Sequence, residues 1–211
     1  MAPEHRSDRQ RAVKDLKRGL ILDAARQVFE SEGLDGASLR AIAAAAGYTP
    51  AALYFHFPSK EAIYAEMLRA SLANLAASIN RASVRAKAPS DRLRAGAIAF
   101  FRYYADNPRD LDLGFYLFRG GMKPQGLGKP HDEVLNAALL GALAPIGAAA
   151  EALGARREEA NVLLVEIFAH AAGLLLLAHT GRMRLFGTSA LHLMQGFVDG
   201  KIAALTAKPK R

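Results

Sequence analysis

The stretch from residue 38 to residue 61 reads Ser-Leu-Arg-Ala-Ile-Ala-Ala-Ala-Ala-Gly-Tyr-Thr-Pro-Ala-Ala-Leu-Tyr-Phe-His-Phe-Pro-Ser-Lys-Glu. It predicts two short helices joined by a tight glycine turn, followed by the start of a third. Ser38 is expected to cap the first helix, because its hydroxyl can accept from an otherwise unpaired backbone N–H. Gly47 is expected to end that helix in a left-handed conformation. Thr49 and Pro50 then predict a cap and a first-turn proline for the second helix.

Apolar residues at helical spacing give each of these two helices one side that can pack against the other. In the first helix they are Leu39, Ile42, Ala43 and Ala46. In the second they are Leu53 and Phe57, and we expect that helix to end at Phe57 and Pro58. A helix, a short glycine turn and a second helix form the helix-turn-helix layout, whose second helix enters the major groove of DNA. The alternative is a helical hairpin that serves only packing.

The same region resembles the signature of the tetracycline-repressor (TetR-type) regulators over residues 20–67. The residues that carry the resemblance are Gly47, Tyr48, Thr49, Ala52, Leu53, Tyr54, His56, Phe57, Ser59, Lys60 and Glu61. The resemblance implies a homodimeric transcriptional regulator that binds a palindromic double-stranded DNA operator. It also implies a small-molecule effector in the C-terminal region.

The rest of the chain predicts an all-α fold of about nine helices, since no alternating β pattern occurs. We expect an N-terminal arm and a three-helix helix-turn-helix bundle over residues 1–59, and a larger C-terminal effector-binding and dimerisation bundle over residues 60–211. The helices outside the motif are expected at residues 12–32, 60–86, 91–106, 108–120, 131–153, 156–181 and 188–206.

Glycine and proline mark the expected interruptions of these helices. Gly33 is predicted to end the first helix. Residues 120–130 contain four glycines and two prolines and predict the one long loop. Pro145 is expected to kink or split the helix in which it lies.

Composition limits the classes of protein that remain. The 211 residues include no cysteine, which excludes disulfides, thiolate metal sites and a cysteine nucleophile. Residues 1–18 contain no apolar leader, so we expect a cytoplasmic protein with no membrane association. The net charge of +8 does not itself argue for DNA binding, because residues 1–68 carry nine basic and nine acidic side chains. The motif carries that argument.

The resemblance implies which residues meet DNA. Arg40 and the face formed by Tyr48, Thr49, Pro50, Ala51 and Tyr54 are expected in the groove, and the positions that match phosphate contacts are Ser38, Thr49, Tyr54, His56 and Lys60. Capping alone is the alternative for the serine and the threonine, and packing is the alternative for Tyr54. The recognition helix offers no Arg, Lys, Asn or Gln, the side chains that read guanine or adenine with two hydrogen bonds. We therefore predict readout by thymine-methyl contacts, Arg40 and DNA shape.

Basic residues are also frequent near the N-terminus. Residues 1–11 are expected to form a disordered arm, and the cations of the first eighteen residues are Arg6, Arg9, Arg11, Lys14, Lys17 and Arg18. A flexible arm that contacts phosphates or a minor groove is one interpretation. A solvated tail is the other, and both stay open.

The resemblance implies an effector pocket in the predicted C-terminal domain, and the aromatic residues that gather there permit a largely apolar ligand. The candidates are Phe100, Tyr103, Tyr104, Phe115, Tyr116, Arg119, Phe168 and His170. An aromatic stripe at helical spacing is also typical of plain core, which is the alternative for each of these residues.

The last two helices are suited to association. Residues 162–178 are apolar almost all round, and a helix of that kind must be covered on every side. Two such helices from each of two chains would form a four-helix bundle about a two-fold axis. The interface candidates are Val162, Val165, Phe168, Leu174, Leu191, Met194, Phe197 and Val198. Intramolecular core is the alternative for both stripes.

We expect no catalytic residues, metal site or cofactor. His170 and His179 are nine residues apart and point to opposite sides of their helix, and neither a Gly-rich phosphate loop nor a nucleophile elbow occurs. The resemblance then implies a repressor that a small, largely apolar effector releases from a palindromic operator. The alternatives are a DNA-binding dimer of the same fold without an effector, and a ligand-binding or catalytic protein whose N-terminal bundle is vestigial.

Overall fold

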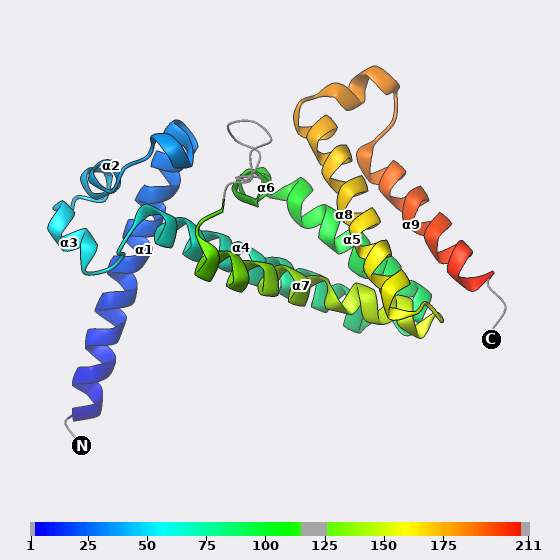
Figure 1. Ribbon diagram of the computed structural model, residues 1–211, viewed down its shortest axis with the longest axis horizontal. Helices are drawn as coiled ribbons and strands as arrows, with labels where there is room; N and C mark the ends of the chain where they lie inside the picture. The colour runs from blue at the N-terminus through cyan, green and yellow to red at the C-terminus, as the bar shows by residue number, and fades with distance from the viewer. Residues whose placement is uncertain (1–2, 115–125, 208–211) are drawn as a thin grey trace. The chain divides into compact units, whose positions relative to one another are not determined.

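The computed structural model describes residues 3–114 and 126–207, and the regular elements within these ranges are all helices (Figure 1). In chain order they are α1 (Pro3–Gly36), α2 (Leu39–Ala45), α3 (Pro50–Tyr54), α4 (Lys60–Arg85), α5 (Pro89–Asp106), α6 (Pro108–Gly114), α7 (Lys129–Ala152), α8 (Arg157–His179), the 3-10 helix η2 (Arg182–Phe186) and α9 (Ala190–Thr206). The predicted all-α fold is confirmed.

The chain divides into two compact units, and the division falls inside α4 between Arg69 and Ala70. The first unit comprises the residues up to Arg69 together with a short segment that ends at Glu133. The sequence placed the boundary ten residues earlier, between residues 59 and 60. The difference arises because the first turns of α4 belong to the N-terminal core: Ile63 and Met67 are buried there, and the Tyr64 ring meets the Phe29 ring of α1 edge-on at 5.0 Å.

The helix-turn-helix is built by the local signals that the sequence contains. The Ser38 hydroxyl accepts a hydrogen bond from Ala41 N at 3.1 Å, and the Thr49 hydroxyl accepts one from Ala52 N at 3.2 Å. Gly47 has φ +73°, in the left-handed region that costs glycine nothing. Ile42 and Leu53 are fully buried, so α2 and α3 share a core. Both predicted caps and the predicted glycine turn are confirmed.

The recognition helix α3 is shorter than predicted. It ends at Tyr54, and the expected end at Phe57 is wrong by three residues. Phe57 N still donates to Leu53 O at 3.0 Å, and the Phe57 ring is buried under the turn that leads into α4. The apolar spacing of the two residues therefore marks a shared core rather than one continuous helix.

The first helix begins much earlier than predicted. α1 starts at Pro3, so the residues expected as a disordered arm are helical from that position. Its break at Gly33, with φ 70° and ψ 176°, confirms the predicted end of the first helix. Leu16 and Leu20 are apolar residues at helical spacing with Ile21 and the core residues that follow, yet both are exposed, because the bundle covers the apolar side of α1 only from Ile21 onward.

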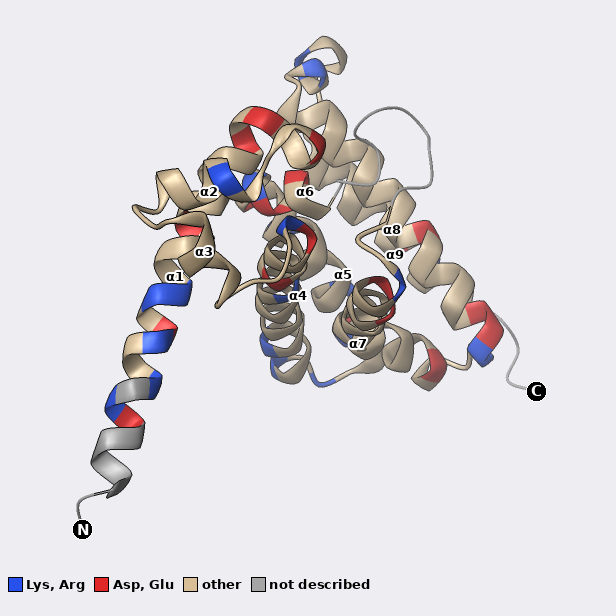
Figure 2. Ribbon diagram, turned by 60° about the vertical axis from the view of Figure 1, so that its left-hand side comes forward, with Lys and Arg blue, Asp and Glu red and all other residues tan. Residues whose placement is uncertain are grey.

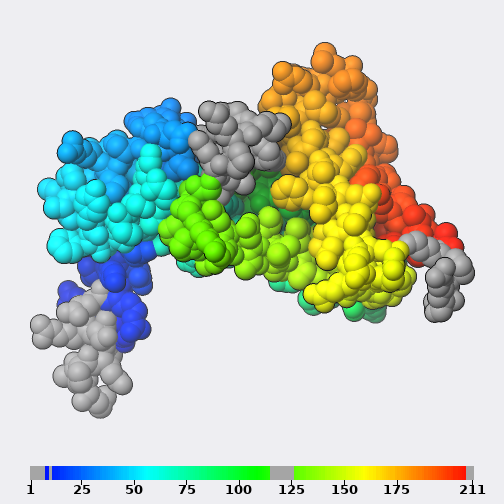
Figure 3. Space-filling model, viewed as in Figure 1, coloured from blue at the N-terminus to red at the C-terminus, as the bar shows by residue number. Residues whose placement is uncertain are grey.

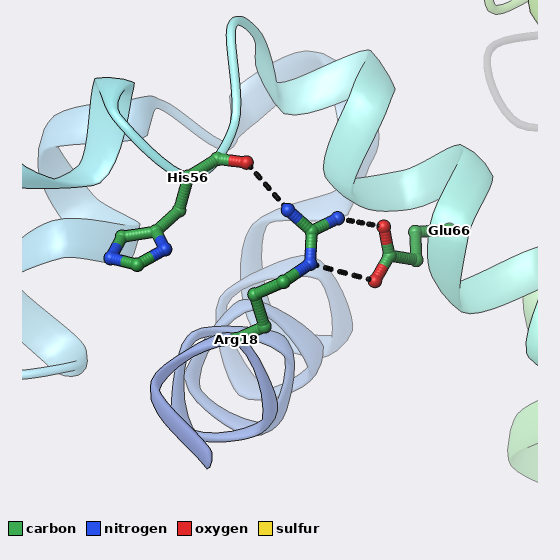
Figure 4. Close-up of polar contacts among 3 residues, drawn as sticks. All are labelled: Arg18, His56 and Glu66. Carbon is green, nitrogen blue, oxygen red and sulfur yellow. Dashed lines mark hydrogen bonds and ion pairs between the residues drawn. The ribbon is translucent and has the colours of Figure 1, made fainter. Parts of the chain in front are cut away.

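One side chain ties three parts of the first unit together (Figure 4). The Arg18 guanidinium of α1 forms two hydrogen bonds with the Glu66 carboxylate of α4. Its Nη1 donates to the carbonyl oxygen of His56 at 2.8 Å, and its Cζ lies 4.2 Å from the Phe57 ring centroid. We call this set of contacts the Arg18 clamp. It fixes the turn after α3 against both long helices.

The second unit is a helical bundle in which α5 packs against both α8 and α9, and α8 packs against α9 (Figure 1). Its core includes Leu93 and Phe100 from α5, Ile167 and Leu175 from α8, and Ile146 from α7, all exposed by 2% or less. Gly96 is required in α5, because a Cβ there would lie 2.9 Å from Ile146 Cγ1. The helices therefore approach closely at this point.

The helix that contains Pro145 is not split. α7 continues through this proline up to Ala152. The predicted loop at residues 120–130 lies largely outside the described residues, as do residues 115–120 of the helix expected at 108–120.

The Arg18 clamp predicts a loss of stability when the arginine is removed. Arg18→Ala should lower the free energy of unfolding by about 2–3 kcal/mol, because it leaves a partly buried carboxylate and a carbonyl without their donor. Urea unfolding of the full chain followed by circular dichroism measures the change.

Arg69→Ala is the matched control, because Arg69 is an exposed arginine of α4 with no partner among the described residues. It should change the same quantity by less than about 0.5 kcal/mol. Equal losses in the two variants would contradict a stabilising role for the clamp.

Candidate nucleic-acid interface

The exposed face of α3 does not contribute to the core of the first unit. Pro50, Ala51 and Tyr54 are exposed, with 58% of Tyr54 accessible, whereas Leu53 alone anchors the helix in the core. Figure 2 shows no Lys or Arg on α3, in agreement with the sequence. This face therefore presents a methyl, a proline ring and a phenol, with no cation of its own.

Arg40 supplies the cation beside this face. It lies on α2, which packs against α3, and its side chain is exposed. The guanidinium has no hydrogen-bond or ion-pair partner among the described residues. An exposed, unpaired arginine on the helix that supports α3 is free to reach a base edge or a phosphate.

Tyr48 and His56 flank α3 at its two ends and approach each other. Their ring centroids are 6.4 Å apart in an edge-on arrangement, and both residues are partly buried. The His56 Nδ1 atom is buried without a hydrogen-bond partner. Burial lowers the pKa of His56 below its usual value, and the positive charges of Lys17, Arg18 and Lys14 lower the same pKa further. The turn after α3 therefore lies in a positive field that comes from α1.

Lys14 and Lys17 are the interface candidates that the sequence did not single out. Both are exposed, they are three residues apart on one side of α1, and neither has a partner among the described residues. Arg18, from the same basic run, is occupied by the Arg18 clamp. The sequence placed all of these cations in one undivided group, and only the longer α1 separates them. Their three-residue spacing was the available signal.

Lys60 has a different role from the phosphate contact that the resemblance implied. Its ammonium donates to three backbone carbonyls, those of Leu34 at 2.7 Å, Asp35 at 3.1 Å and Ala37 at 3.0 Å. These carbonyls follow the break at Gly33, where helical partners are missing. An ammonium has three protons, so in this arrangement none is left for DNA. We correct Lys60 from a phosphate contact to a cap for the end of α1.

The predicted effector residues divide into two groups. The rings of Phe100, Tyr103, Tyr104 and Phe168 lie together, with centroids 5.1–5.9 Å apart between successive neighbours. Phe100 and Tyr104 are buried core residues, as the alternative interpretation expected. His170 belongs elsewhere, because it stacks on Phe197 of α9 at 4.1 Å. Phe115, Tyr116 and Arg119 lie outside the described residues.

The dimer prediction is corrected at three residues. Leu174, Met194 and Val198 are exposed by only 6%, 0% and 0%, so they belong to the core of a single chain. Leu191 and Phe197 are partly buried. The α8 residues Val162, Val165 and Phe168 are exposed by 59%, 68% and 37% and remain candidates, and Leu176 of the same helix joins them with 63%.

No group of three or more His, Asp or Glu side chains that could hold a metal ion occurs in the described part of the chain. This geometry defines a class of protein: an all-α helix-turn-helix protein with an accessible recognition helix and a separate helical bundle.

Comparison with known proteins identifies the family. Residues 21–67 match the model of the bacterial regulatory proteins of the tetR family. The transcriptional activator FasR of Mycolicibacterium smegmatis is 36% identical over 105 residues, which is 50% of this chain and 48% of that protein. The transcriptional regulator AcrR of Shigella flexneri is 40% identical over 55 residues, 26% of either chain. The alignments thus span about half or less of these curated relatives.

Solved structures extend the likeness to the whole fold. A bacterial regulatory protein of the tetR family from Rhodococcus RHA1 superposes with a TM-score of 0.68 at 19% identity, covering 92% of this chain and 98% of that one. A TetR family transcription regulator from Marinobacter aquaeolei VT8 gives 0.66 at 18% identity, with 90% and 96% covered. At these identities the likeness shows the fold. The family match itself covers the helix-turn-helix unit, residues 21–67, and supports a TetR-type regulator.

The basic face of α1 predicts a measurable salt dependence. For a fluorescent duplex, replacing Lys14 and Lys17 together by glutamine should flatten the slope of log K against log salt by up to about 2, because each phosphate contact contributes roughly 0.9. Fluorescence anisotropy at several salt concentrations measures the slope.

Lys60→Gln is the comparison variant. It should lower the thermal midpoint of unfolding, because three carbonyls lose their donor, and should leave the slope of the folded protein nearly unchanged. A slope that flattens for Lys60→Gln and not for the α1 variant would reverse the two assignments.

Proposed function

We propose that this chain is a DNA-binding transcriptional regulator that inserts α3 into the major groove of DNA. The observation that carries the proposal is the exposed face of α3, whose side chains do not contribute to the core. The Arg18 clamp fixes the turn after α3, and the Lys60 cap fixes the end of α1 in the same unit. A rigid scaffold that presents an unoccupied helix face beside exposed cations is the arrangement that groove recognition requires. The match of residues 21–67 to the bacterial regulatory proteins of the tetR family supports the same function.

The proposed contacts follow from the side chains available. Arg40 is the base-reading cation, and Pro50 and Ala51 meet thymine methyls. Thr49, Tyr54 and the α1 lysines contact phosphates, and Ser38 combines capping with such a contact. Because α3 offers no group that reads guanine or adenine with two hydrogen bonds, much of the specificity comes from DNA shape. Tyr48 and His56 frame the helix and hold its ends.

We also propose that the protein is a homodimer whose interface lies on α8 and α9. Figure 3 shows α8, in yellow and orange, at the surface of the second unit. Val162, Val165 and Leu176 line one exposed side of α8, and a Cβ added at Gly196 or Gly200 of α9 would point into open space. An apolar face of this kind marks an interaction surface in a soluble protein. A partner that presents the same face would cover it about a two-fold axis.

The membrane is the other environment that could cover this face. α7 and α8 are both long and apolar enough to span a bilayer, and only 39% and 28% of their most apolar segments are buried. α8 carries Glu158, Glu159 and Glu166, and the last of these pairs with Lys201 of α9 at 2.6 Å. Charged side chains of this kind are expensive inside a bilayer. Dimerisation in the cytoplasm accounts for the same surface without that cost.

We propose further that a small ligand controls DNA binding, as in a repressor that an apolar effector releases from its operator. The aromatic cluster around Phe100 and Phe168 supports a mainly apolar ligand. The relative FasR is named an activator, whereas the direction of control proposed for this chain is repression. A DNA-binding dimer without an effector is the second candidate. Effector titrations with and without operator DNA separate them, since coupling must act equally in both directions.

No catalytic activity is part of the proposal. TetR-family proteins are regulators rather than enzymes, and the histidines do not lie at a catalytic spacing.

The proposed readout predicts a specific effect for Arg40. Footprinting on the DNA that flanks the chain's own gene should locate a palindromic operator. On that operator Arg40→Ala should weaken binding by at least about tenfold, the loss expected for one good base contact. Anisotropy measures the affinities.

An unchanged affinity in Arg40→Ala would remove this residue from the readout. The absence of any protected sequence, together with equal affinity for all duplexes, would contradict sequence-specific regulation altogether.

The proposed interface predicts that a charge on α8 separates the subunits. Val165→Glu should convert the dimer into a monomer, because two buried carboxylates would face each other across the two-fold axis. Light scattering coupled to size-exclusion chromatography measures the mass.

Val84→Glu is the matched control, because Val84 of α4 is 83% exposed and lies away from α8 and α9 in the chain. It should leave the mass unchanged. A dimer that survives Val165→Glu would place the interface elsewhere.

A further inference from the structure

The second unit contains an open groove, of about 1000 Å³, that belongs neither to α3 nor to the aromatic cluster. It runs between the C-terminal half of α4 and α5, and Gln195 of α9 borders it. Small side chains leave the space free, namely Ala77, Ala82, Ala95 and Ala99. A groove of this volume is large enough for a drug-sized ligand.

One end of the groove is strongly basic. Arg81 and Arg85 are four residues apart on α4, so they lie on one face about 6 Å apart along the helix axis. Neither guanidinium has a partner among the described residues. Figure 2 shows basic residues at this end of α4. Arg94 of α5 lies at the same end and is held by Asp91 at 3.3 Å and by Asp199 at 2.6 Å.

The first turn of α5 adds to this positive region. α5 starts four residues after Arg85, and its N-cap residue is Ala88, which has no side-chain oxygen to accept from the first backbone N–H groups. A helix start with free N–H groups favours anions. Two unpaired arginines next to it form a fork that matches the oxygens of a phosphate group.

The other end of the groove has different chemistry. It is lined mainly by neutral and acidic hydrogen-bonding groups, namely Asn74, Ser78, Tyr103, Asp106, Asn107 and Asp110, with Arg102 as its one cation among the described lining residues. The Tyr103 hydroxyl donates to the Asp110 carboxylate and lies 3.0 Å from the Ser71 carbonyl oxygen. Burial and the Asp110 carboxylate raise the pKa of Tyr103 to about 12. The hydroxyl therefore stays protonated and holds Asp110 in place.

This polarity along the groove discriminates between ligands. A nucleic acid strand carries a negative charge at every phosphate, so the carboxylates of Asp106 and Asp110 would repel it. A molecule with a phosphate at one end and hydroxyl or amide groups at the other satisfies both ends of the groove.

We propose that this groove binds a small phosphorylated molecule that carries hydroxyl groups, such as a sugar phosphate or a nucleotide. The phosphate lies against Arg81 and Arg85, and the hydroxyl-bearing part lies between Asn74 and Asp106. The inference does not depend on DNA binding by α3, and it adds a second, polar ligand to the apolar effector proposed above.

Isothermal titration calorimetry of the full chain with glucose 6-phosphate, adenosine diphosphate and inorganic phosphate tests the proposal. At least one of the two esters should bind more tightly than about 1 mM and more tightly than inorganic phosphate. The double variant Arg81→Gln/Arg85→Gln should weaken ester binding at least about tenfold, because it removes the charged hydrogen bonds to the phosphate.

Arg157→Gln is the control, since Arg157 is an exposed arginine of the same unit outside the groove. It should leave ester binding unchanged, and circular dichroism should show that both variants are folded. Failure of both esters to bind would overturn the proposal. So would equal affinity for inorganic phosphate, which indicates an anion site only, or an equal loss in Arg157→Gln, which indicates general charge attraction.

Discussion

The position of the recognition helix depends on one guanidinium. α3 has five residues and a single buried anchor, Leu53, so it cannot hold its own orientation. Arg18 supplies what is missing, because it binds the turn after α3 and the Glu66 carboxylate of α4 at the same time. Lys60 does the same at the other side of the bundle, where it closes the end of α1. Two cations of the first unit thus serve its interior, and the DNA-facing charge that we propose for this unit comes from others, among them Arg40, Lys14 and Lys17.

The features that sequence could predict are those decided by near neighbours. The caps at Ser38 and Thr49 and the turn at Gly47 involve partners within three or four residues, and all three were found. The contacts of Arg18 and Lys60 join residues 23 to 48 positions apart, so no local pattern contains them. Periodicity was also insufficient for α8 and α9. An apolar helix has two sides of similar composition, and only the packed bundle shows that Met194 faces inward and Val165 outward.

The second unit combines surfaces of different character. The exposed side of α8 is apolar and suits a second copy of the chain, while the α4–α5 groove is polar and charged along its length. Because the arginines of the groove account for part of the basic excess beyond residue 68, the net charge of the chain and its DNA-binding charge have separate origins. The basic isoelectric point of the chain is therefore not evidence for DNA binding, because the excess positive charge lies outside the helix-turn-helix unit.

The exposed face of α3 can change in evolution without loss of the fold. Pro50, Ala51 and Tyr54 support neither the core nor the Arg18 clamp, so the fold tolerates exchange at these positions. With α3 in the major groove, as we propose, an asparagine or arginine at position 51 would give the helix a base contact of two hydrogen bonds with little effect on folding. Selection can therefore retarget such a protein to a new operator in a single step, while the side chains that orient the helix stay under independent constraint.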